Sequence, residues 1–510
     1  MALNFPNPVI FQAFEWDVPA DQKHWKRLLA ILPILHSIGV TTLWLPPACK
    51  ASNPSSNGYD IYDLYDLGEF SQKRSISTKW GPKTDLLALA AEAERLEIGL
   101  VFDAVLNHRC GGDAKANVMV VEVDKNDRTK NVGAPKEIEA WLKFDFPGRR
   151  SKYSSTKLTW HDFNATDWDD RTQRNSIFKL VSGGKDWAQD VDKTEHGNSD
   201  YLLLNNLDYT SPALRDDVKK WGVWITEHLN LSGFRLDALQ HFSHGFSNEW
   251  MRCISSNARR RMLFLGEFWT GNVKLLTDWL DKSFKGLRLY DAPLLYNLAR
   301  TSWAKDPDLG SVFNYTLVQA RPNFAVTLVM NHDTQRGQVM DTPVKPEFMQ
   351  LAYALILLRR DGIPCIFYGD MFGICGPYSS PPTCWGKLPD LVLARKLYAF
   401  GDQVDYFDGR HCVGWVRKGI PEGYARSVGM AVTHVASRLL QKRMFVGREW
   451  AGEVWTDLLK RKSVEVVIDR EGYGVFPCQR NSVAVYVWKD AEARERFPVN
   501  MNVNIYALGR

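Results

Sequence analysis

Short apolar runs of the kind that form β-strands recur along most of the chain. Eight of them lie at residues 8–14, 41–47, 98–108, 233–238, 261–269, 287–297, 324–333 and 362–370. Several segments between them, at 25–39, 83–97 and 345–362, repeat apolar residues at positions i, i+3 and i+4, the period of a helix packed on a sheet. Eight strands alternating with helices predict an α/β protein built as a (β/α)8 TIM barrel. An open doubly wound sheet is the alternative, but no glycine-rich phosphate loop opens its first helix.

Two parts of the chain do not fit a bare barrel. The interval 109–205 is too long for a βα loop of ~2 to 6 residues, so we expect an inserted domain after the third strand, on the catalytic face. The barrel would then comprise residues 1–108 and 206–402. Beyond 402 the helical period gives way to β-type runs at 427–435, 442–448, 463–469 and 482–488, which predict a C-terminal antiparallel β-sandwich over 403–490. Residues 491–510 show no partner pattern, and we expect a loosely held tail.

The charge balance narrows the class of partner. The 510-residue chain carries 64 Lys and Arg against 59 Asp and Glu, a net charge of +5 spread without a basic block. This balance argues against nucleic acid or an anionic membrane as the main partner. The 19 tryptophans and the aromatic content of 12% exceed what core packing usually needs, and flat rings also stack on sugars.

The sequence also indicates the location of the protein and the redox state of its cysteines. The start of the chain, MALNFPNPVIFQAFEW, has no basic residue and its apolar run is broken by Asn and Pro, so we expect no secretory signal and a cytoplasmic protein. The longest apolar run, at 31–47, contains prolines and suits a helix end followed by a strand better than a membrane span. The eight cysteines show no CxxC spacing, as expected of reduced thiols in a cytosolic enzyme. We expect a monomer.

Acidic residues lie at the ends of four predicted strands: Asp103, Asp237, Glu267 and Asp333. In a barrel of this type, the catalytic groups sit where the strands end. Residues i and i+2 of a strand share a face, so Arg235 can lie beside Asp237 and hold that carboxylate ionised. A plain structural ion pair is the alternative interpretation of this motif taken alone.

Two histidines accompany these acids, His108 in the first motif and His332 in the last. Three acids and two histidines around one pocket fit cleavage of a glycosidic bond, in which one carboxylate attacks the anomeric carbon and another protonates the leaving oxygen. A metal hydrolase is disfavoured because the sequence has no HExxH, HxxEH or His-x-His pattern.

The segments DAVLNH, GFRLDALQH, GEFW and MNHD resemble the four signature regions of the α-amylase family, glycoside hydrolase family 13. Further segments, among them GYDIYDLYDLGEF and FDFPGRR, extend this resemblance over most of the chain, to liquefying bacterial α-amylases and intracellular fungal relatives. The resemblance implies an endo-acting enzyme that cleaves α-1,4-glucans such as starch, glycogen or maltooligosaccharides.

Position by position, the resemblance implies that Asp237 is the nucleophile and Glu267 the general acid/base. Asp333 would be the third carboxylate, which grips sugar hydroxyls. In a retaining enzyme the first two carboxyl groups lie ~5 to 5.5 Å apart and the product keeps the α-configuration. The apolar neighbours of Glu267 favour its protonated form. The substrate-binding residues implied by the same motifs are Trp16, Tyr59, Asp103, His108, Arg235, Gln240, His241 and His332.

The resemblance also implies a calcium ion between the inserted domain and the barrel. Its oxygen ligands would be Asn107, Asp200, Asn206 and the backbone carbonyl of His241, since hard oxygen donors suit Ca²⁺. Asn206 stands where relatives carry an aspartate, and an amide brings no charge, so we expect weaker binding and at most one calcium ion. Ordinary loop capping by Asp200 and Asn206 is the alternative.

A second departure affects the acceptor side of the cleft. Gln240 stands where the family commonly has lysine, so a cation that would contact the leaving sugars is missing. Because water and a second glucan compete for the same glycosyl-enzyme intermediate, a 4-α-glucanotransferase is the alternative to a hydrolase. A third possibility, a non-catalytic glucan-binding relative, is disfavoured because all three acids are retained.

Overall fold

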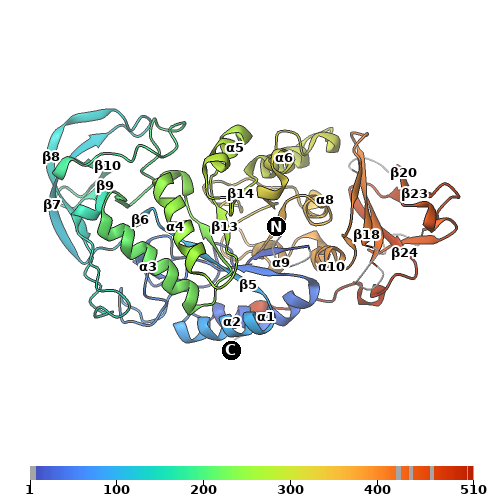
Figure 1. Ribbon diagram of the computed structural model, residues 1–510, viewed down its shortest axis with the longest axis horizontal. Helices are drawn as coiled ribbons and strands as arrows, with labels where there is room; N and C mark the ends of the chain where they lie inside the picture. The colour runs from blue at the N-terminus through green and yellow to red at the C-terminus, as the bar shows by residue number, and fades with distance from the viewer. Residues whose placement is uncertain (1–6, 421–426, 436–439, 460–463, 502, 509–510) are drawn as a thin grey trace.

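The computed structural model describes residues 7–420, 427–435, 440–459, 464–501 and 503–508. The chain forms three parts in a row: an inserted sheet, a central barrel and a C-terminal sheet (Figure 1). The first six residues, on which part of the expectation about a signal rests, lie outside the described residues.

A closed barrel of eight parallel strands forms the centre, as the spacing of the apolar runs predicts. Its strand order is β1-β16-β15-β14-β13-β12-β5-β2. Each predicted run contains one strand, and the (β/α)8 fold is confirmed. The strands are β1 (Ile10–Gln12), β2 (Thr42–Trp44), β5 (Gly99–Ala104), β12 (Gly233–Leu236), β13 (Leu263–Gly266), β14 (Leu287–Tyr290), β15 (Ala325–Leu328) and β16 (Ile363–Phe367).

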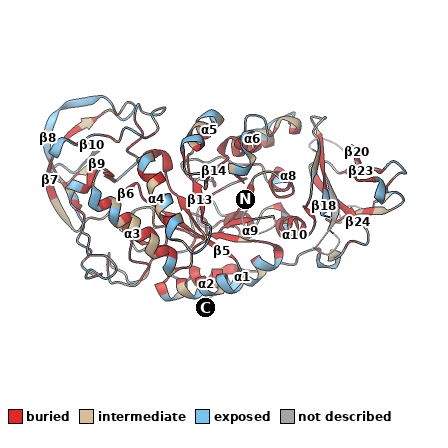
Figure 2. Cartoon of the chain, viewed as in Figure 1, coloured by how far each residue is buried: buried red, intermediate tan, exposed pale blue. Residues whose placement is uncertain are grey.

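Helices surround the barrel and turn their apolar faces to it (Figure 2). In the first helix, Leu28, Ile31, Leu32 and Leu35 are fully buried at the predicted period. Gly39 then ends the helix in the left-handed conformation, at φ 117°, which a side chain would strain. The helices are α1 (His24–Ile38), α2 (Lys83–Arg95), α3 (Pro212–His228), α4 (His244–Asn257), α5 (Val273–Lys282), α6 (Ala292–Trp303), α7 (Leu317–Ala320), α8 (Pro346–Leu357), α9 (Tyr368–Phe372) and α10 (Leu388–Tyr398).

A six-stranded sheet occupies the long interval after β5, in the order β6-β11-β9-β10-β7-β8. Its last strand returns beside its first, with Asn206 opposite His108, so the insertion brings distant residues to the rim of the barrel. The proposed boundaries at 109 and 205 fall within one to two residues of this sheet's ends and stay predictions. The strands are β6 (His108–Arg109), β7 (Ala114–Val123), β8 (Asn131–Lys143), β9 (Phe163–Asp169), β10 (Arg174–Leu180) and β11 (Asn205–Leu207), and a separate pair joins β3 (Lys50–Ala51) to β4 (Ile61–Asp63).

An antiparallel β-domain follows the barrel, in agreement with the predicted fold class. One sheet has the order β17-β18-β19-β24-β21-β22 and a second pairs β20 with β23. The predicted runs correspond to β19, β20, β22 and β24. The strands are β17 (Gln403–Tyr406), β18 (Cys412–Ile420), β19 (Ser427–Val435), β20 (Leu440–Phe445), β21 (Val454–Asp457), β22 (Glu465–Val467), β23 (Tyr473–Cys478) and β24 (Ser482–Trp488).

The segment after residue 490 is held more closely than its sequence suggests. Phe497 and Ile505 are buried, and the ring of Phe497 stacks on Tyr398 of α10. Tyr506 lies under the Arg27 guanidinium of α1. These residues pack singly onto the barrel helices. The sequence therefore shows no helical or strand period that would predict their burial.

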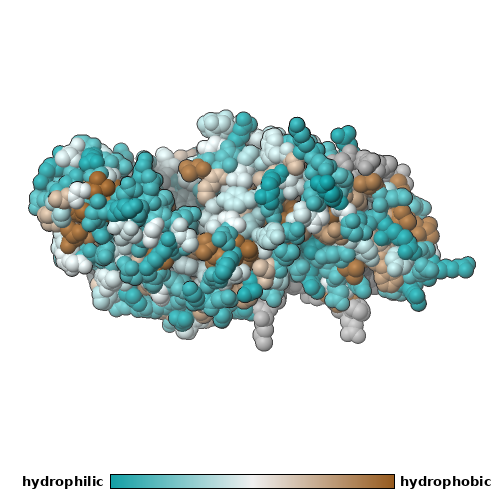
Figure 3. All heavy atoms as spheres, turned by 90° about the horizontal axis from the view of Figure 1, so that it is seen from above, coloured by the Kyte–Doolittle hydropathy of each residue, from teal (hydrophilic) through white to brown (hydrophobic). Residues whose placement is uncertain are grey.

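The thiols and the surface agree with the composition. The eight cysteines, all within the described ranges, form no disulfide bond. No helix in the described part of the chain is long and apolar enough to cross a membrane. The face shown in Figure 3 is mostly hydrophilic, with hydrophobic groups in small separate areas.

Candidate active site

Four charged residues of the signature motifs, Asp103, Arg235, Asp237 and Glu267, meet at the carboxyl ends of three adjacent strands. Strand β12 pairs with β5 on one side and β13 on the other, which sets Arg235 opposite Asp103. Asp237 and Glu267 follow directly after their strands, and therefore leave the barrel side by side. The register explains why residues so far apart in sequence form one cluster.

Arg235 joins three carboxylates. Its Nη1 donates to Asp103 Oδ1 and to Asp237 Oδ1, both at 2.7 Å. Its Nη2 donates to Glu267 Oε2 at 2.6 Å. Such charge-assisted bonds fix the orientation of each carboxylate.

The cluster has a buried layer and an accessible layer. The side chains of Asp103 and Arg235 are 0% and 1% exposed, whereas those of Asp237 and Glu267 are each 10% exposed. The side chain of Asp333 is 24% exposed. Asp103 and Arg235 therefore support the site from below, while the three acids face the cleft.

Burial and the neighbouring charges separate the protonation states of the central pair. Burial raises the pKa of Asp237 to about 6, although the charge of Arg235 opposes this rise. Burial also raises the pKa of Glu267, and the charge of Asp237 adds to that rise. A hydrogen bond between the two carboxyl groups lowers the pKa of Asp237 and raises that of Glu267. At neutral pH this favours an ionised Asp237 beside a protonated Glu267.

Three nearly parallel rings form a wall next to the acids. Trp16 and Tyr59 lie 6.0 Å apart between ring centroids at an interplanar angle of 5°, and Tyr59 and His332 lie 5.3 Å apart at 6°. Burial lowers the pKa of His332 well below its ordinary value, so the ring is neutral.

A hydrogen-bond chain links this wall to Asp103. Nε2 of Gln12 contacts His332 Nδ1 at 2.9 Å, and His332 Nε2 contacts the Tyr59 hydroxyl at 2.7 Å. That hydroxyl donates to Asp103 Oδ2 at 3.1 Å. Since Gln12 donates to Nδ1, the proton of the neutral ring sits on Nε2. Asp103 thus accepts hydrogen bonds both from Arg235 and from Tyr59 of the wall.

The remaining predicted substrate-binding residues differ in whether their side chains already have hydrogen-bond partners in the protein. His108 is 1% exposed and its Nε2 donates to the Tyr59 carbonyl at 2.7 Å, so it supports the wall from behind. His241 Nδ1 donates to the Ser199 carbonyl at 2.7 Å. Gln240 is different, because its buried Oε1 has no hydrogen-bond partner among the described residues.

Sequence reasoning missed several residues of this site. Gln12 lies inside a predicted apolar strand, and Trp44 donates from its Nε1 to Asp103 Oδ2 at 3.0 Å. Gln335 lies two residues beyond Asp333 and is fully buried. A polar residue inside an apolar run was the available signal for Gln12; nothing in the pattern distinguished Trp44.

The four predicted calcium ligands come together beside this site. Asn107 Nδ2 lies 2.5 Å from the His241 carbonyl oxygen and 3.2 Å from Asn206 Oδ1. Asn164, which was not predicted, connects the rest: its Nδ2 donates to Asp200 Oδ2 at 2.7 Å and its Oδ1 accepts from Asn206 Nδ2 at 2.8 Å. No cluster of three or more His, Cys, Asp or Glu side chains suited to a metal occurs in the described ranges.

The donor chemistry of this group fits one hard cation. Burial raises the pKa of Asp200 to about 7, and the negative charge of Asp208 adds to that rise. The pKa of His108 is lowered to about 4 by burial, so its ring carries one proton, on the Nε2 that donates to Tyr59. Its Nδ1 therefore accepts, which favours turning the Asn107 amide, 3.1 Å away, so that its oxygen joins the other two oxygens. Converging oxygens with one carboxylate suit Ca²⁺.

Two hollows are lined by aromatic side chains, one at the aromatic wall of the site and one on the inserted sheet. One, of about 550 Å³, is lined by Trp16, Asp17, Asn57, Tyr59 and Lys79. The other, of about 380 Å³, lies on the inserted sheet and is lined by residues including Cys110, Trp141, Thr166, Trp168 and Asn205. Aromatic side chains line both, as in sites that stack sugars.

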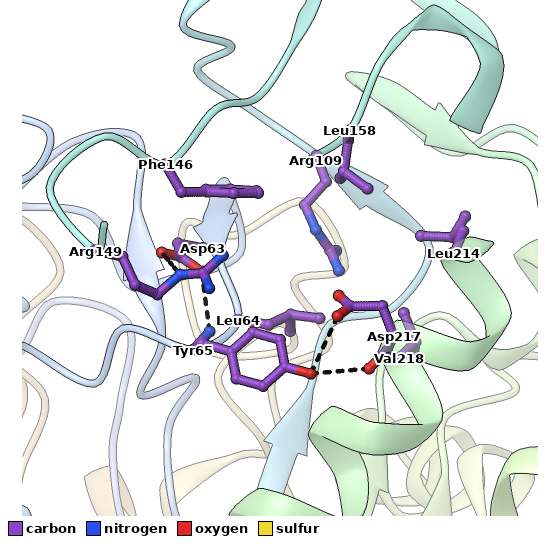
Figure 4. Close-up of a pocket in the computed structure, with 10 residues that line it drawn as sticks. All are labelled: Asp63, Leu64, Tyr65, Arg109, Phe146, Arg149, Leu158, Leu214, Asp217 and Val218. Atoms are coloured by element: carbon purple, nitrogen blue, oxygen red, sulfur yellow. Dashed lines mark hydrogen bonds and ion pairs between the residues drawn. The ribbon is translucent and has the colours of Figure 1, made fainter. Parts of the chain in front are cut away.

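A third cavity is too small for a sugar. Its volume is about 10 Å³, room for one water molecule. Arg109 and Asp217 point toward it from opposite sides, and the Tyr65 hydroxyl donates to Asp217 Oδ1 at 3.3 Å (Figure 4). We regard it as a structural junction between the inserted sheet and α3.

A (β/α)8 barrel with paired carboxyl groups at its strand ends is the architecture of a glycoside hydrolase. Residues 24–425 match the family model of the α-amylase catalytic domain. The chain is 39% identical over 483 residues to an α-amylase of Bacillus licheniformis, covering 94% of this chain and 93% of the relative. It is 36% identical over 493 residues to the cytoplasmic α-amylase of Escherichia coli (strain K12), covering 94% and 99% of the two chains.

A glucan 1,4-α-maltohexaosidase of Bacillus sp. (strain 707) is also 39% identical over 488 residues, covering 95% of this chain and 93% of that protein. Among solved structures, an α-amylase from Geobacillus thermoleovorans complexed with acarbose matches with a TM-score of 0.61 at 18% identity, over 95% of this chain and 98% of that one, which supports the fold. The chain belongs to the α-amylase family of glycoside hydrolases.

Proposed function

We propose that the chain is a retaining, endo-acting α-1,4-glucan hydrolase that acts on starch, glycogen or maltooligosaccharides. The observation that carries this proposal is the contact between Asp237 and Glu267, two carboxyl groups at adjacent strand ends that bind the same Arg235 guanidinium and share a hydrogen bond. Inverting enzymes keep the two groups about 6.5–9.5 Å apart to admit a water molecule. A pair in contact supports the retaining route.

The reaction proceeds in two displacements. Asp237 attacks the anomeric carbon and forms a glycosyl ester, while the bond to the leaving oxygen breaks and that oxygen takes the proton of Glu267. The ionised Glu267 then removes a proton from water, whose oxygen displaces Asp237 from the anomeric carbon. Arg235 holds both carboxylates in place throughout.

The neighbouring residues act on the sugar at the cleavage point. Asp333 is the most exposed of the three acids and would accept bonds from sugar hydroxyls. The parallel rings of Trp16 and Tyr59 offer a face on which a sugar stacks. The hollow of about 550 Å³ beside these rings supports a substrate of more than one glucose unit.

The direct test is incubation with maltoheptaose, with the lengths and anomeric form of the products followed over time. We expect shorter maltooligosaccharides released initially as α-anomers. Asp237→Asn and Glu267→Gln should each lower the rate about 100-fold or more, while keeping the melting temperature near that of the wild type. Most of the activity remaining in either variant, or β-anomers as first products, would refute the assignment.

The unpartnered oxygen of Gln240 favours a second candidate, a 4-α-glucanotransferase. Turned toward the cleft, the neutral amide of Gln240 would hold a sugar hydroxyl on the acceptor side, and a bound glucan would then replace water in the second displacement. Products longer than maltoheptaose would support transfer. A non-catalytic glucan-binding protein would give neither shorter nor longer chains.

We also propose one calcium ion, held by Asn107, Asp200, Asn206 and the His241 carbonyl. When bound, it would supply a positive charge that joins the inserted sheet to the barrel.

The named relative from Escherichia coli supports a cytoplasmic location. Fractionation of the cells that make this protein would test the location.

A further inference from the structure

A buried polar cluster holds the backbone of Trp16 at both ends. On one side, the Trp16 N–H donates to Gln335 Oε1 at 3.0 Å. On the other, the Trp16 carbonyl accepts from Asn57 Nδ2 at 3.0 Å and from Lys79 Nζ at 3.3 Å. The ring of Trp16 belongs to the aromatic wall, with its centroid 6.0 Å from that of Tyr59 and 5.9 Å from that of His332.

Glu15 completes the cluster and connects three loops of the barrel. Its Oε2 accepts from Asp17 N at 2.7 Å and from Gln335 Nε2 at 3.2 Å, and its Oε1 accepts from Cys375 N at 3.2 Å. These residues belong to the loops after β1, β15 and β16. Glu15 and Gln335 are both 0% exposed. Burying a carboxylate is costly, and here its hydrogen bonds serve to join loops.

The turn that carries Gln335 also carries Asp333. Asn331 Oδ1 accepts from the backbone N–H groups of Asp333 at 3.0 Å and Thr334 at 2.8 Å, and Gln335 N donates to the Asn331 carbonyl at 3.0 Å. This rigid turn presents the catalytic acid toward the cleft and the glutamine toward Trp16. A displacement of Trp16 is therefore passed to Asp333.

We propose that Gln335, supported by Glu15, is a positioning residue that ties the turn of Asp333 to the Trp16 wall. The inference rests on the proposed hydrolase function. Because Gln335 does not face the sugar, its loss should affect kcat through the placement of Asp333 more than it affects KM. Small displacements of catalytic groups lower rates strongly.

The test compares Gln335→Met with a matched control, Gln72→Met. Gln72 is also buried, and its Nε2 donates at 3.0 Å to both Asp63 Oδ2 and Asp66 Oδ2, but it does not contact the wall. Hydrogen exchange of the Trp16 amide should become faster in Gln335→Met and stay unchanged in Gln72→Met. Unchanged protection of Trp16 in Gln335→Met would show that the tie does not exist.

Kinetics on maltoheptaose supply the second measurement. We expect kcat to fall about tenfold or more in Gln335→Met with KM within about threefold, and little change per folded molecule in Gln72→Met. A loss confined to KM, or the same loss of kcat in both variants, would overturn the positioning role. If the wild type cleaved no α-glucan, the proposed function would fail instead, and amide exchange would still decide whether the tie exists.

A conservative pair guards against misfolding. Gln335→Glu keeps an acceptor for Trp16 but sets a second carboxylate against Glu15, so kcat should fall. Adding Glu15→Gln restores a hydrogen bond with donor and acceptor exchanged, and kcat should recover about threefold or more relative to Gln335→Glu alone. A double variant no faster than the single one would contradict the inference.

Discussion

At the scale of single residues, the site depends on one cation shared by three carboxylates. Arg235 cannot neutralise Asp103, Asp237 and Glu267 together, so the cluster lowers its energy by keeping one proton. Burial and the charge of Asp237 raise the pKa of Glu267, which favours Glu267 as the carboxyl group that keeps the proton. The sequence predicted the pairing of Arg235 with Asp237 from their i, i+2 spacing, but not the reach of Arg235 to Glu267, which depends on the barrel register.

The pH dependence follows from this arrangement. Asp237 attacks only when ionised, and burial raises its pKa to about 6. We therefore expect kcat/KM to fall as the pH drops through about 6, approaching tenfold per pH unit below it. The measurement is kcat/KM on maltoheptaose between pH 4 and 8, at pH values where the melting temperature shows the protein folded. An acid limb near pH 4, the ordinary value for an aspartate, would contradict the raised pKa.

At the scale of elements, the apolar runs identified the barrel strands because each strand is buried on both faces. They placed Asp333 at the end of the predicted strand 324–333, but β15 already ends at Leu328, and Asp333 lies beyond it in a turn held by the Asn331 side chain. They could not indicate Asn164, a buried polar residue on β9 whose partners come from β11 and from Asp200. The strand register and the contacts between loops decide these positions. The apolar period of a single segment gives no information about either.

Gly233 of β12 lies where the barrel leaves no room for a side chain. A Cβ at Gly233 would stand 2.0 Å from the Leu263 carbonyl oxygen of β13. Backbone of a central sheet cannot move aside, so Gly233→Ala should lower the free energy of unfolding by roughly 3 kcal/mol. Urea unfolding checks this value. In Gly271→Ala the added carbon would meet Tyr296 at an ordinary 3.4 Å, and we expect a change within about 0.5 kcal/mol. Equal stability of the two variants would contradict the steric argument.

At the scale of the whole molecule, contacts between the three parts were the least predictable from sequence. Arg359, near the end of α8, pairs with Asp405 of β17 at 2.7 Å and lies over the rings of Phe313, Phe407 and Trp415. The C-terminal segment adds Ile505 against the barrel. On the other side, Asp190 of the insertion accepts from Ser243 and Gly245 at the start of α4. Only the assembled chain brings such residues together.

The proposed calcium ion would act at this same scale, since its ligands come from the end of β5, the inserted part and the loop after β12. Anything that binds only the folded state stabilises it, by about 2.7 kcal/mol when the ligand is at 100 times its Kd. With Asp200 as the single carboxylate the affinity should be modest, so we expect the melting temperature to fall in EDTA and to rise again with millimolar Ca²⁺. Mg²⁺, which demands a smaller and more regular site, should restore much less.

Asp200→Asn removes the charge but leaves acceptors for Asn164 and the Ala188 N–H, so it should melt at one temperature with or without Ca²⁺. Identical melting curves for the wild type in EDTA and in Ca²⁺ would show that the insertion is joined to the barrel without a calcium ion.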